Sequence, residues 1–163
     1  MSSRRPPWVN IDLRWSPEVR DIVIAHAVAA YPYECCGYLT GPLLPAHQLT
    51  KAARATNQAT ARGSSPRDTF AMDELRLARA LEEGVRSHQP VKVIYHSHCD
   101  ANADLSMRDR HSFLVGEQLS WPCAFLILDI RDKKLHGYRL WSHVVGTQSF
   151  QTRSLTQHDA EDH

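Results

Sequence analysis

Residues 91–109 read VKVIYHSHCDANADLSMRD and lead from a short apolar segment through a polar turn to the start of a helix. The first five residues are mostly β-branched or aromatic, which predicts a central strand over 91–95. Side chains two positions apart on a strand point to the same face, so His96 and His98 present two imidazoles side by side at the end of this strand. The segment therefore combines a buried strand with a pair of potential metal ligands.

The residues on either side predict alternating strands and helices. Ser16 is a typical helix cap, with proline and glutamate directly after it, and Pro32 would end that helix. Apolar residues at intervals of three or four predict a second helix over 72–85, and a third is expected over 106–116. We expect further strands over 9–13, 36–40 and 49–56, and a closing hairpin formed by 124–130 and 135–141.

These elements predict a single-domain fold of the α+β (mixed α/β) class, with a mixed sheet flanked by helices. We place the domain at 9–145 and expect flexible termini over 1–8 and 146–163, because residues beyond 145 show no apolar period. The polar residues 58–68 include Gly63-Ser64-Ser65-Pro66 and predict a mobile loop. Two hypotheses remain open for it, a flap that orders on a bound substrate or a solvated connector.

Composition limits the classes of function. The 163 residues include 19 Lys and Arg against 18 Asp and Glu, so the basic excess typical of nucleic-acid or membrane-surface binding is missing. The longest apolar run, 124–128, is too short to cross a bilayer, and no apolar stretch follows the first charged residues. We therefore expect a cytoplasmic protein whose four cysteines stay reduced.

The histidine pair points to metal binding. Two neutral imidazoles on one face suit zinc, and a catalytic zinc takes three protein ligands and leaves one position for water. A carboxylate would complete the set, and local geometry leaves Asp100, Asp104 and Asp109 open. The chain has ten histidines, so a His-x-His pair alone is weak evidence. Ser106 and Asp109 also have an ordinary explanation as a capping box that opens a helix.

Taken together, these residues resemble a known family. The pattern His96-x-His98, seven residues, Ser106, two residues, Asp109 matches the signature of the JAMM (MPN+) zinc metallopeptidases. That family also has an upstream glutamate in a segment similar to residues 32–37, PYECCG, where Glu34 takes the glutamate's place. The resemblance extends over about residues 9–141, with further similarities at Asn57, Phe70 and Trp121-Pro122. It implies an MPN/JAB-like fold, a sandwich similar to that of cytidine deaminases.

The resemblance also implies a mechanism. One zinc per chain would be held by His96, His98 and Asp109, and Glu34 would take a proton from the attacking water and pass it to the leaving amine. Ser106 would donate to the oxygen on which negative charge develops. A zinc deaminase activity is excluded, because the chain lacks the His-x-Glu motif and the second cysteine that should follow Pro122-Cys123.

Members of the family cleave amide or isopeptide bonds after the C-terminal Gly-Gly of ubiquitin-like proteins. Only 11 residues separate Asp109 from Trp121, which leaves little room for the insertion of eukaryotic deubiquitinating members and makes the chain similar to compact bacterial members. The expected partner is a ubiquitin-like sulfur-carrier protein with a C-terminal Gly-Gly, with no nucleic acid and no membrane involved. The alternatives are an isopeptidase that deconjugates a bacterial ubiquitin-like modifier and an inactive scaffold module.

Overall fold

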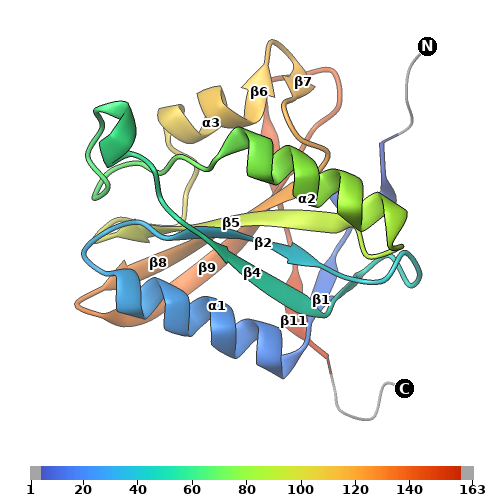
Figure 1. Ribbon diagram of the computed structural model, residues 1–163, viewed down its shortest axis with the longest axis horizontal. Coiled ribbons are helices and arrows are strands. Elements are labelled where there is room, and N and C mark those ends of the chain that lie inside the picture. The colour runs from blue at the N-terminus through green and yellow to red at the C-terminus, as the bar shows by residue number, and fades with distance from the viewer. Residues whose placement is uncertain (1–4, 159–163) are drawn as a thin grey trace.

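The computed structural model describes residues 5–158 and is built around a six-stranded sheet of order β10-β9-β8-β5-β2-β4 (Figure 1). The central strand β5 (Val91–Cys99) runs parallel to β8 (Ala124–Arg131) and antiparallel to β2 (Cys36–Thr40). The sheet is completed by β4 (Lys51–Ala55), β9 (Lys134–His143) and β10 (Phe150–Arg153). The sheet is mixed, which confirms the predicted fold class.

Helices cover both faces of the sheet. Figure 1 shows α1 (Pro17–Ala30) on one face, and α2 (Glu74–Arg86) with α3 (Met107–Phe113) on the other. Each face has its own apolar core. Side chains of α1 pack against alternate residues of β5 and β8, such as Val93 and Leu126, whereas α2 and α3 pack against Ile94 and Phe125. This arrangement of layers leaves the end of β5 next to the start of α3.

Several short elements complete the described chain. They are the 3-10 helices η1 (Pro7–Asn10) and η2 (Thr60–Arg62), a small parallel sheet of β1 (Leu13–Trp15), β3 (Gln48–Leu49) and β11 (Leu155–Gln157), and a hairpin of β6 (Leu114–Val115) and β7 (Gln118–Leu119). No helix in residues 5–158 has both the length and the apolar character that a bilayer crossing requires.

Several predicted elements differ from the structure at their ends. The strand expected over 9–13 begins only at Leu13, because consecutive prolines start η1 just before it. The strand expected over 49–56 is divided between β3, which pairs with β1, and β4, which pairs with β2. The helix expected over 106–116 ends at Phe113, where the chain turns into the β6–β7 hairpin.

The prediction of a flexible C-terminal segment is wrong for residues 150–157. Strand β10 pairs with the edge strand β9, and β11 pairs with β1 near the start of the chain. At the other end, Arg5 contacts His143 and Trp8 is buried, so the structure places residues 5–8 against the domain. Residues 1–4 and 159–163 of the two predicted flexible segments lie outside the described residues.

Strand β5 is longer than predicted and buried almost throughout its nine residues. A fully buried lysine, Lys92, lies near its start and donates hydrogen bonds to the carbonyl oxygens of Pro42, Ala46 and Gln48 at 2.7–2.9 Å. These three acceptors satisfy the whole ammonium group, so burial of the lysine does not leave an unpaired donor. The other end of β5 carries the histidine pair.

Candidate metal centre

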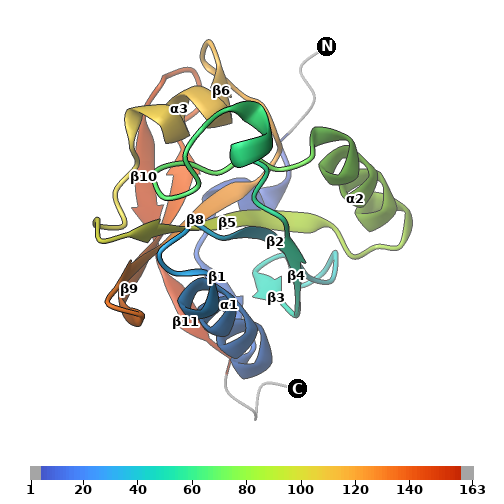
Figure 2. The same cartoon turned by 60° about the vertical axis from the view of Figure 1, so that its left-hand side comes forward.

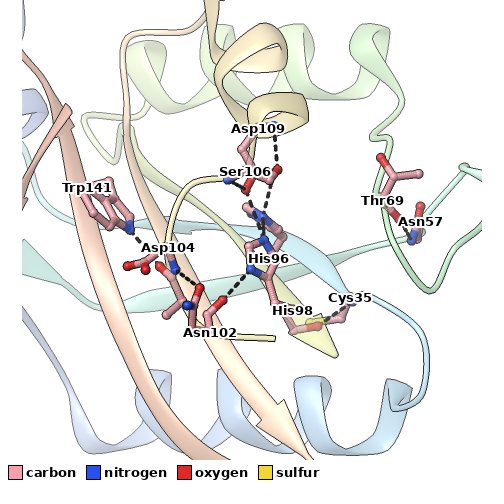
Figure 3. A network of polar contacts seen from close by, with 12 residues as sticks. Cys35, Asn57, Thr69, His96, His98, Asn102, Asp104, Ser106, Asp109 and Trp141 are labelled. Carbon is pink, nitrogen blue, oxygen red and sulfur yellow. Dashed lines mark hydrogen bonds and ion pairs between the residues drawn. The ribbon is translucent and has the colours of Figure 1, made fainter. Parts of the chain in front are cut away.

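The two histidines of β5 and the aspartate of α3 converge on one point. The Nε2 atoms of His96 and His98 lie 3.2 Å apart, and each lies 3.1 Å from a different carboxylate oxygen of Asp109. All three residues are buried, His96 completely. Figure 3 shows the two rings pointing toward the first turn of α3, which carries Asp109. The structure thus brings together the three residues predicted to bind zinc.

Ser106 fixes the start of α3 and the orientation of Asp109. The Asp109 N–H donates to the Ser106 Oγ at 3.0 Å, and the Ser106 N–H donates to the Asp109 Oδ2 at 3.0 Å. This is the reciprocal capping box expected from the sequence. Since Oδ2 also faces His98, the same carboxylate both caps the helix and faces the imidazole pair.

The antiparallel pairing of β2 with β5 brings Glu34 to the same site. Cys36 pairs with His96, and one step earlier the Cys35 N–H donates to the Ser97 Oγ at 2.8 Å. Glu34 is next along the chain, and it is only 6 % exposed. The ligand atoms of Glu34, His96 and His98 all lie within 4.8 Å of one another, which makes these three residues a possible metal-binding group.

Asp100 and Asp104, the two other candidates for the third ligand, contact other residues and not the histidines. Asp100 accepts the hydroxyl of Tyr31 at 2.8 Å, and Asp104 forms an ion pair with Arg139. Asp109 is therefore the aspartate that faces the histidines.

A hydrogen bond determines which nitrogen of His98 carries the proton. The His98 Nδ1 lies 2.7 Å from the carbonyl oxygen of Asn102, and a carbonyl can only accept, so Nδ1 is the protonated nitrogen. The Nε2 of the neutral ring therefore presents a lone pair to the carboxylate of Asp109. Two acceptors facing each other at 3.1 Å repel unless a proton or a metal cation lies between them.

The donor set and its spacing fit a small tetrahedral cation. Zinc binds imidazole nitrogens and carboxylate oxygens at about 2.0–2.1 Å, which places tetrahedral ligands about 3.3–3.4 Å apart. The Nε2 atoms of His96 and His98 lie 3.2 Å apart, close to that value, and each has one oxygen of the Asp109 carboxylate at 3.1 Å. Glu34 is an additional carboxylate beside this cluster. The residues present therefore fit a metal ion of the zinc type.

Burial and charge act in opposite directions on the ionisable groups. Burial raises the pKa of Glu34 to about 8, so without a cation this carboxyl tends to keep its proton. Burial also opposes ionisation of Asp109, but the two histidines hold its pKa well below the usual range. For His98, burial lowers the pKa, but the carboxylate of Asp109 more than offsets this and raises it overall.

Sequence reasoning gave no role to Asn57, whose side chain connects Glu34 with the following loop. Its Nδ2 donates to the carbonyl oxygens of Glu34 at 2.9 Å and Thr69 at 3.0 Å. Its Oδ1 accepts the N–H groups of Ala59 and Ala71. This one amide holds both ends of the loop, which the residue type alone does not reveal.

Phe70 lies between Thr69 and Ala71, whose backbone groups bond to Asn57, and its ring covers His96. The two rings stack with centroids 4.2 Å apart and an interplanar angle of 23°. The His96 Nδ1 is buried and has no hydrogen-bond partner within residues 5–158. An aromatic ring therefore fixes the plane of His96, whereas a backbone carbonyl fixes that of His98.

The loop over 58–68 has more structure than its composition predicts. It contains η2, which is followed by Gly63 with a left-handed φ of 76°. The carbonyl oxygen of Pro66 accepts the N–H of Glu34 at 2.7 Å, so the loop contacts the candidate site directly. Figure 2 shows this segment in green beside α3, on the same side of the sheet.

Hydrogen exchange can distinguish the two hypotheses for this loop. If it is a flap, its amides exchange fast in the free protein, since few of its side chains are buried, and slow at least about tenfold when a Gly-Gly-tailed carrier binds the Glu34→Gln variant. The amide of Leu77 in α2 serves as the reference, because its residue is buried in a regular helix. Equal exchange in the free and bound states would identify the loop as a connector.

The comparisons with known proteins agree with this geometry. The family model for prokaryotic homologs of the JAB domain matches residues 16–154. Among solved structures, a protein from Desulfitobacterium hafniense is similar with a TM-score of 0.71 at 18% identity, covering 93% of this chain and 96% of that one. A protein from Salinibacter ruber has a TM-score of 0.61 at 24% identity, with 91% and 94% covered.

A third similar structure is described as a JAB1/MPN domain protein from Archaeoglobus fulgidus. Its TM-score is 0.54 at 11% identity, and the alignment covers 90% of this chain and 99% of that one. The comparison with curated proteins gave no match. The fold and the site define a JAB/MPN domain with a possible metal centre. The chain belongs to the family of prokaryotic homologs of the JAB domain.

Proposed function

We propose that this protein is a zinc-dependent metallopeptidase that hydrolyses an amide bond after the C-terminal Gly-Gly of a ubiquitin-like sulfur-carrier protein. The observation that carries the proposal is the convergence of two imidazoles and two carboxylates from three separate parts of the chain. His96 and His98 come from β5, Asp109 comes from α3, and Glu34 comes from the segment before β2. The JAB domain family to which the chain belongs includes JAMM peptidases.

In this proposal, His96, His98 and Asp109 hold the metal. A zinc ion at such a site supplies Lewis acidity, polarising a carbonyl and lowering the pKa of water to about 7. The hydrogen bond from the His98 Nδ1 to Asn102 fixes the tautomer that ligation needs, as is usual for histidine ligands. Asp109 is pre-oriented by the two hydrogen bonds of the capping box.

Glu34 is the proposed general base. Its carboxylate lies within 4.8 Å of the ligand atoms of both imidazoles, so it would be close to a water bound at this site. Burial raises the pKa of Glu34 to about 8, which strengthens it as a proton acceptor, and a cation bound at the site would keep it ionised at neutral pH. After taking the proton from water, the carboxyl can return it to the amine that leaves.

Ser106 is the proposed hydrogen-bond donor to the carbonyl oxygen of the substrate. Its Oγ already accepts the Asp109 N–H, and its hydroxyl proton is still available for donation. The residue is exposed at the start of α3, beside the metal ligands. Removing one donor of this kind lowers turnover by about 10² to 10³ in other enzymes.

A mass-spectrometric assay tests the reaction directly. We expect the purified zinc-loaded protein to shorten candidate sulfur-carrier proteins that bear a C-terminal extension beyond Gly-Gly, with the cut directly after the second glycine. Replacing that glycine by valine should reduce cleavage at least about tenfold, because a tail without Cβ atoms passes most easily through a narrow cleft. The proposal would be contradicted if the candidate carriers kept their full mass after incubation with folded, zinc-loaded protein.

The same assay separates two alternatives. An isopeptidase would cleave a branched conjugate, in which the Gly-Gly carboxyl is joined to a lysine side chain, in preference to the linear extension. An inactive scaffold module would cleave neither substrate. The intact set of His96, His98, Asp109 and Glu34 favours an enzyme over a scaffold, because a scaffold has no need for three proposed metal ligands and a general base that are buried at one point.

A further inference from the structure

The loop between β5 and α3 carries the acceptor that orients His98. The His98 Nδ1–H donates to the carbonyl oxygen of Asn102 at 2.7 Å, and this bond sets both the tautomer and the plane of the ring. Asn102 itself is exposed, so its own side chain packing does not hold its carbonyl in place. The position of this acceptor depends on what holds the next residues of the loop.

Two side chains of β9 hold those residues. The indole Nε1–H of Trp141 donates to the carbonyl oxygen of Ala103 at 3.0 Å, and the guanidinium of Arg139 forms an ion pair with Asp104. Trp141 and Arg139 are two positions apart on β9 and thus lie on the same face of the strand. Ala103 is buried under them, although the residues on either side of it are more exposed.

A further hydrogen bond connects Asp104 back to Asn102. The Asp104 N–H donates to the Asn102 Oδ1 at 3.2 Å, which closes a turn around Ala103. Figure 3 shows the resulting chain of contacts, from Trp141 through the turn to Asn102 and then to His98. The peptide that carries the acceptor for His98 is therefore followed directly by two residues, Ala103 and Asp104, that are anchored to side chains of β9.

We infer that Trp141 and Arg139 are positioning residues for the metal ligand His98. By anchoring Ala103 and Asp104, they fix the Asn102 carbonyl and keep the Nε2 lone pair of His98 aimed at the point between His96 and Asp109. This role rests on the proposed function, since it concerns the same metal site. Both residues act through the loop and touch no reacting atom.

The test is the zinc affinity of Trp141→Phe, measured by competition with a chromogenic chelator. Phenylalanine keeps the aromatic packing of Trp141 against the apolar cluster between the sheet and α3, and removes the Nε1–H. Loss of a partner that directly supports a ligand costs 10- to 100-fold in metal affinity. Since Trp141 acts one step further away, we expect zinc affinity to fall about tenfold, while the metal-free protein should still unfold in one cooperative transition.

Trp8→Phe is a matched control. The Trp8 Nε1–H also donates to a loop carbonyl, that of Pro122, at 3.1 Å, but Trp8 lies beside Lys92 at the opposite end of β5. This variant should keep the zinc affinity of the wild type. The visible spectrum of the cobalt-substituted protein, which reports ligand geometry, should change in Trp141→Phe and stay the same in Trp8→Phe.

A second variant keeps the test decisive if Trp141→Phe fails to fold. Arg139→Gln removes the ion pair with Asp104, and we expect zinc affinity to fall about threefold or more. Its control is Arg76→Gln, which removes an exposed ion pair at the start of α2. Unchanged zinc affinity and cobalt spectra in the folded β9 variants would overturn this role alone. A wild-type protein that binds no zinc would overturn the proposed function together with this role.

Discussion

Glu34→Gln is expected to lower the turnover of a Gly-Gly-tailed carrier by at least about 10²-fold and to leave the zinc content unchanged. Glutamine keeps the shape of the side chain and its hydrogen-bonding capacity, but it cannot accept a proton from water. The backbone of Glu34 is held by Asn57 and by Pro66, so the substitution changes the carboxyl group without releasing the segment. Zinc content is measured by elemental analysis and turnover by mass spectrometry of the carrier.

Glu82→Gln is the control for this substitution, because Glu82 is exposed on α2. Two outcomes would contradict the assignment in different ways. Turnover close to that of the wild type would show that Glu34 is not the base. A loss of zinc would instead place Glu34 among the ligands, in agreement with its position within 4.8 Å of the histidine ligand atoms.

The histidine pair and its strand were predictable from the sequence, because strand periodicity is local. Two positions along an extended chain determine that His96 and His98 share a face, and β5 has them on one face beside Asp109. The starts of α1 and α3 were predictable for the same reason. Ser16 and Ser106 both accept a hydrogen bond from the N–H three residues later, as serine caps do.

The place of Glu34 could not be derived from local patterns. It is brought to the site by the antiparallel register in which Cys36 pairs with His96, and nothing in residues 32–37 specifies that register. The family resemblance supplied the role of Glu34 as an expectation. The choice of Asp109 over Asp100 and Asp104 has a similar explanation, because it depends on partners far away in sequence, such as Tyr31 and Arg139.

The C-terminal strands were missed for a different physical reason. In β11 only Leu155 is buried, and β10 has no fully buried residue, so neither strand has an apolar period that a sequence can show. They are held mainly by backbone pairing with β9 and β1. The acceptor for His98 was equally invisible, since the carbonyl of Asn102 is a backbone atom that every residue type would supply.

Asp109→Asn is expected to lower zinc affinity by at least about 10²-fold, so that protein purified without added metal contains far less than one zinc per chain. Asparagine preserves the size of the side chain and an oxygen for the Ser106 N–H, and α3 should therefore keep its cap. What is lost is the negative charge between two imidazoles, and a neutral amide is a much weaker zinc ligand than a carboxylate.

Asp100→Asn is the matched control, because Asp100 lies two residues after His98 but accepts the Tyr31 hydroxyl and has a left-handed φ of 59° that asparagine tolerates. It should retain about one zinc per chain. Normal zinc content in Asp109→Asn would remove Asp109 as a ligand. The carboxylates of Asp109 and Glu34 both lie beside the same imidazole pair, but only the one that is a ligand is needed to hold the metal. The zinc contents of Asp109→Asn and Glu34→Gln together therefore decide which of the two completes the ligand set.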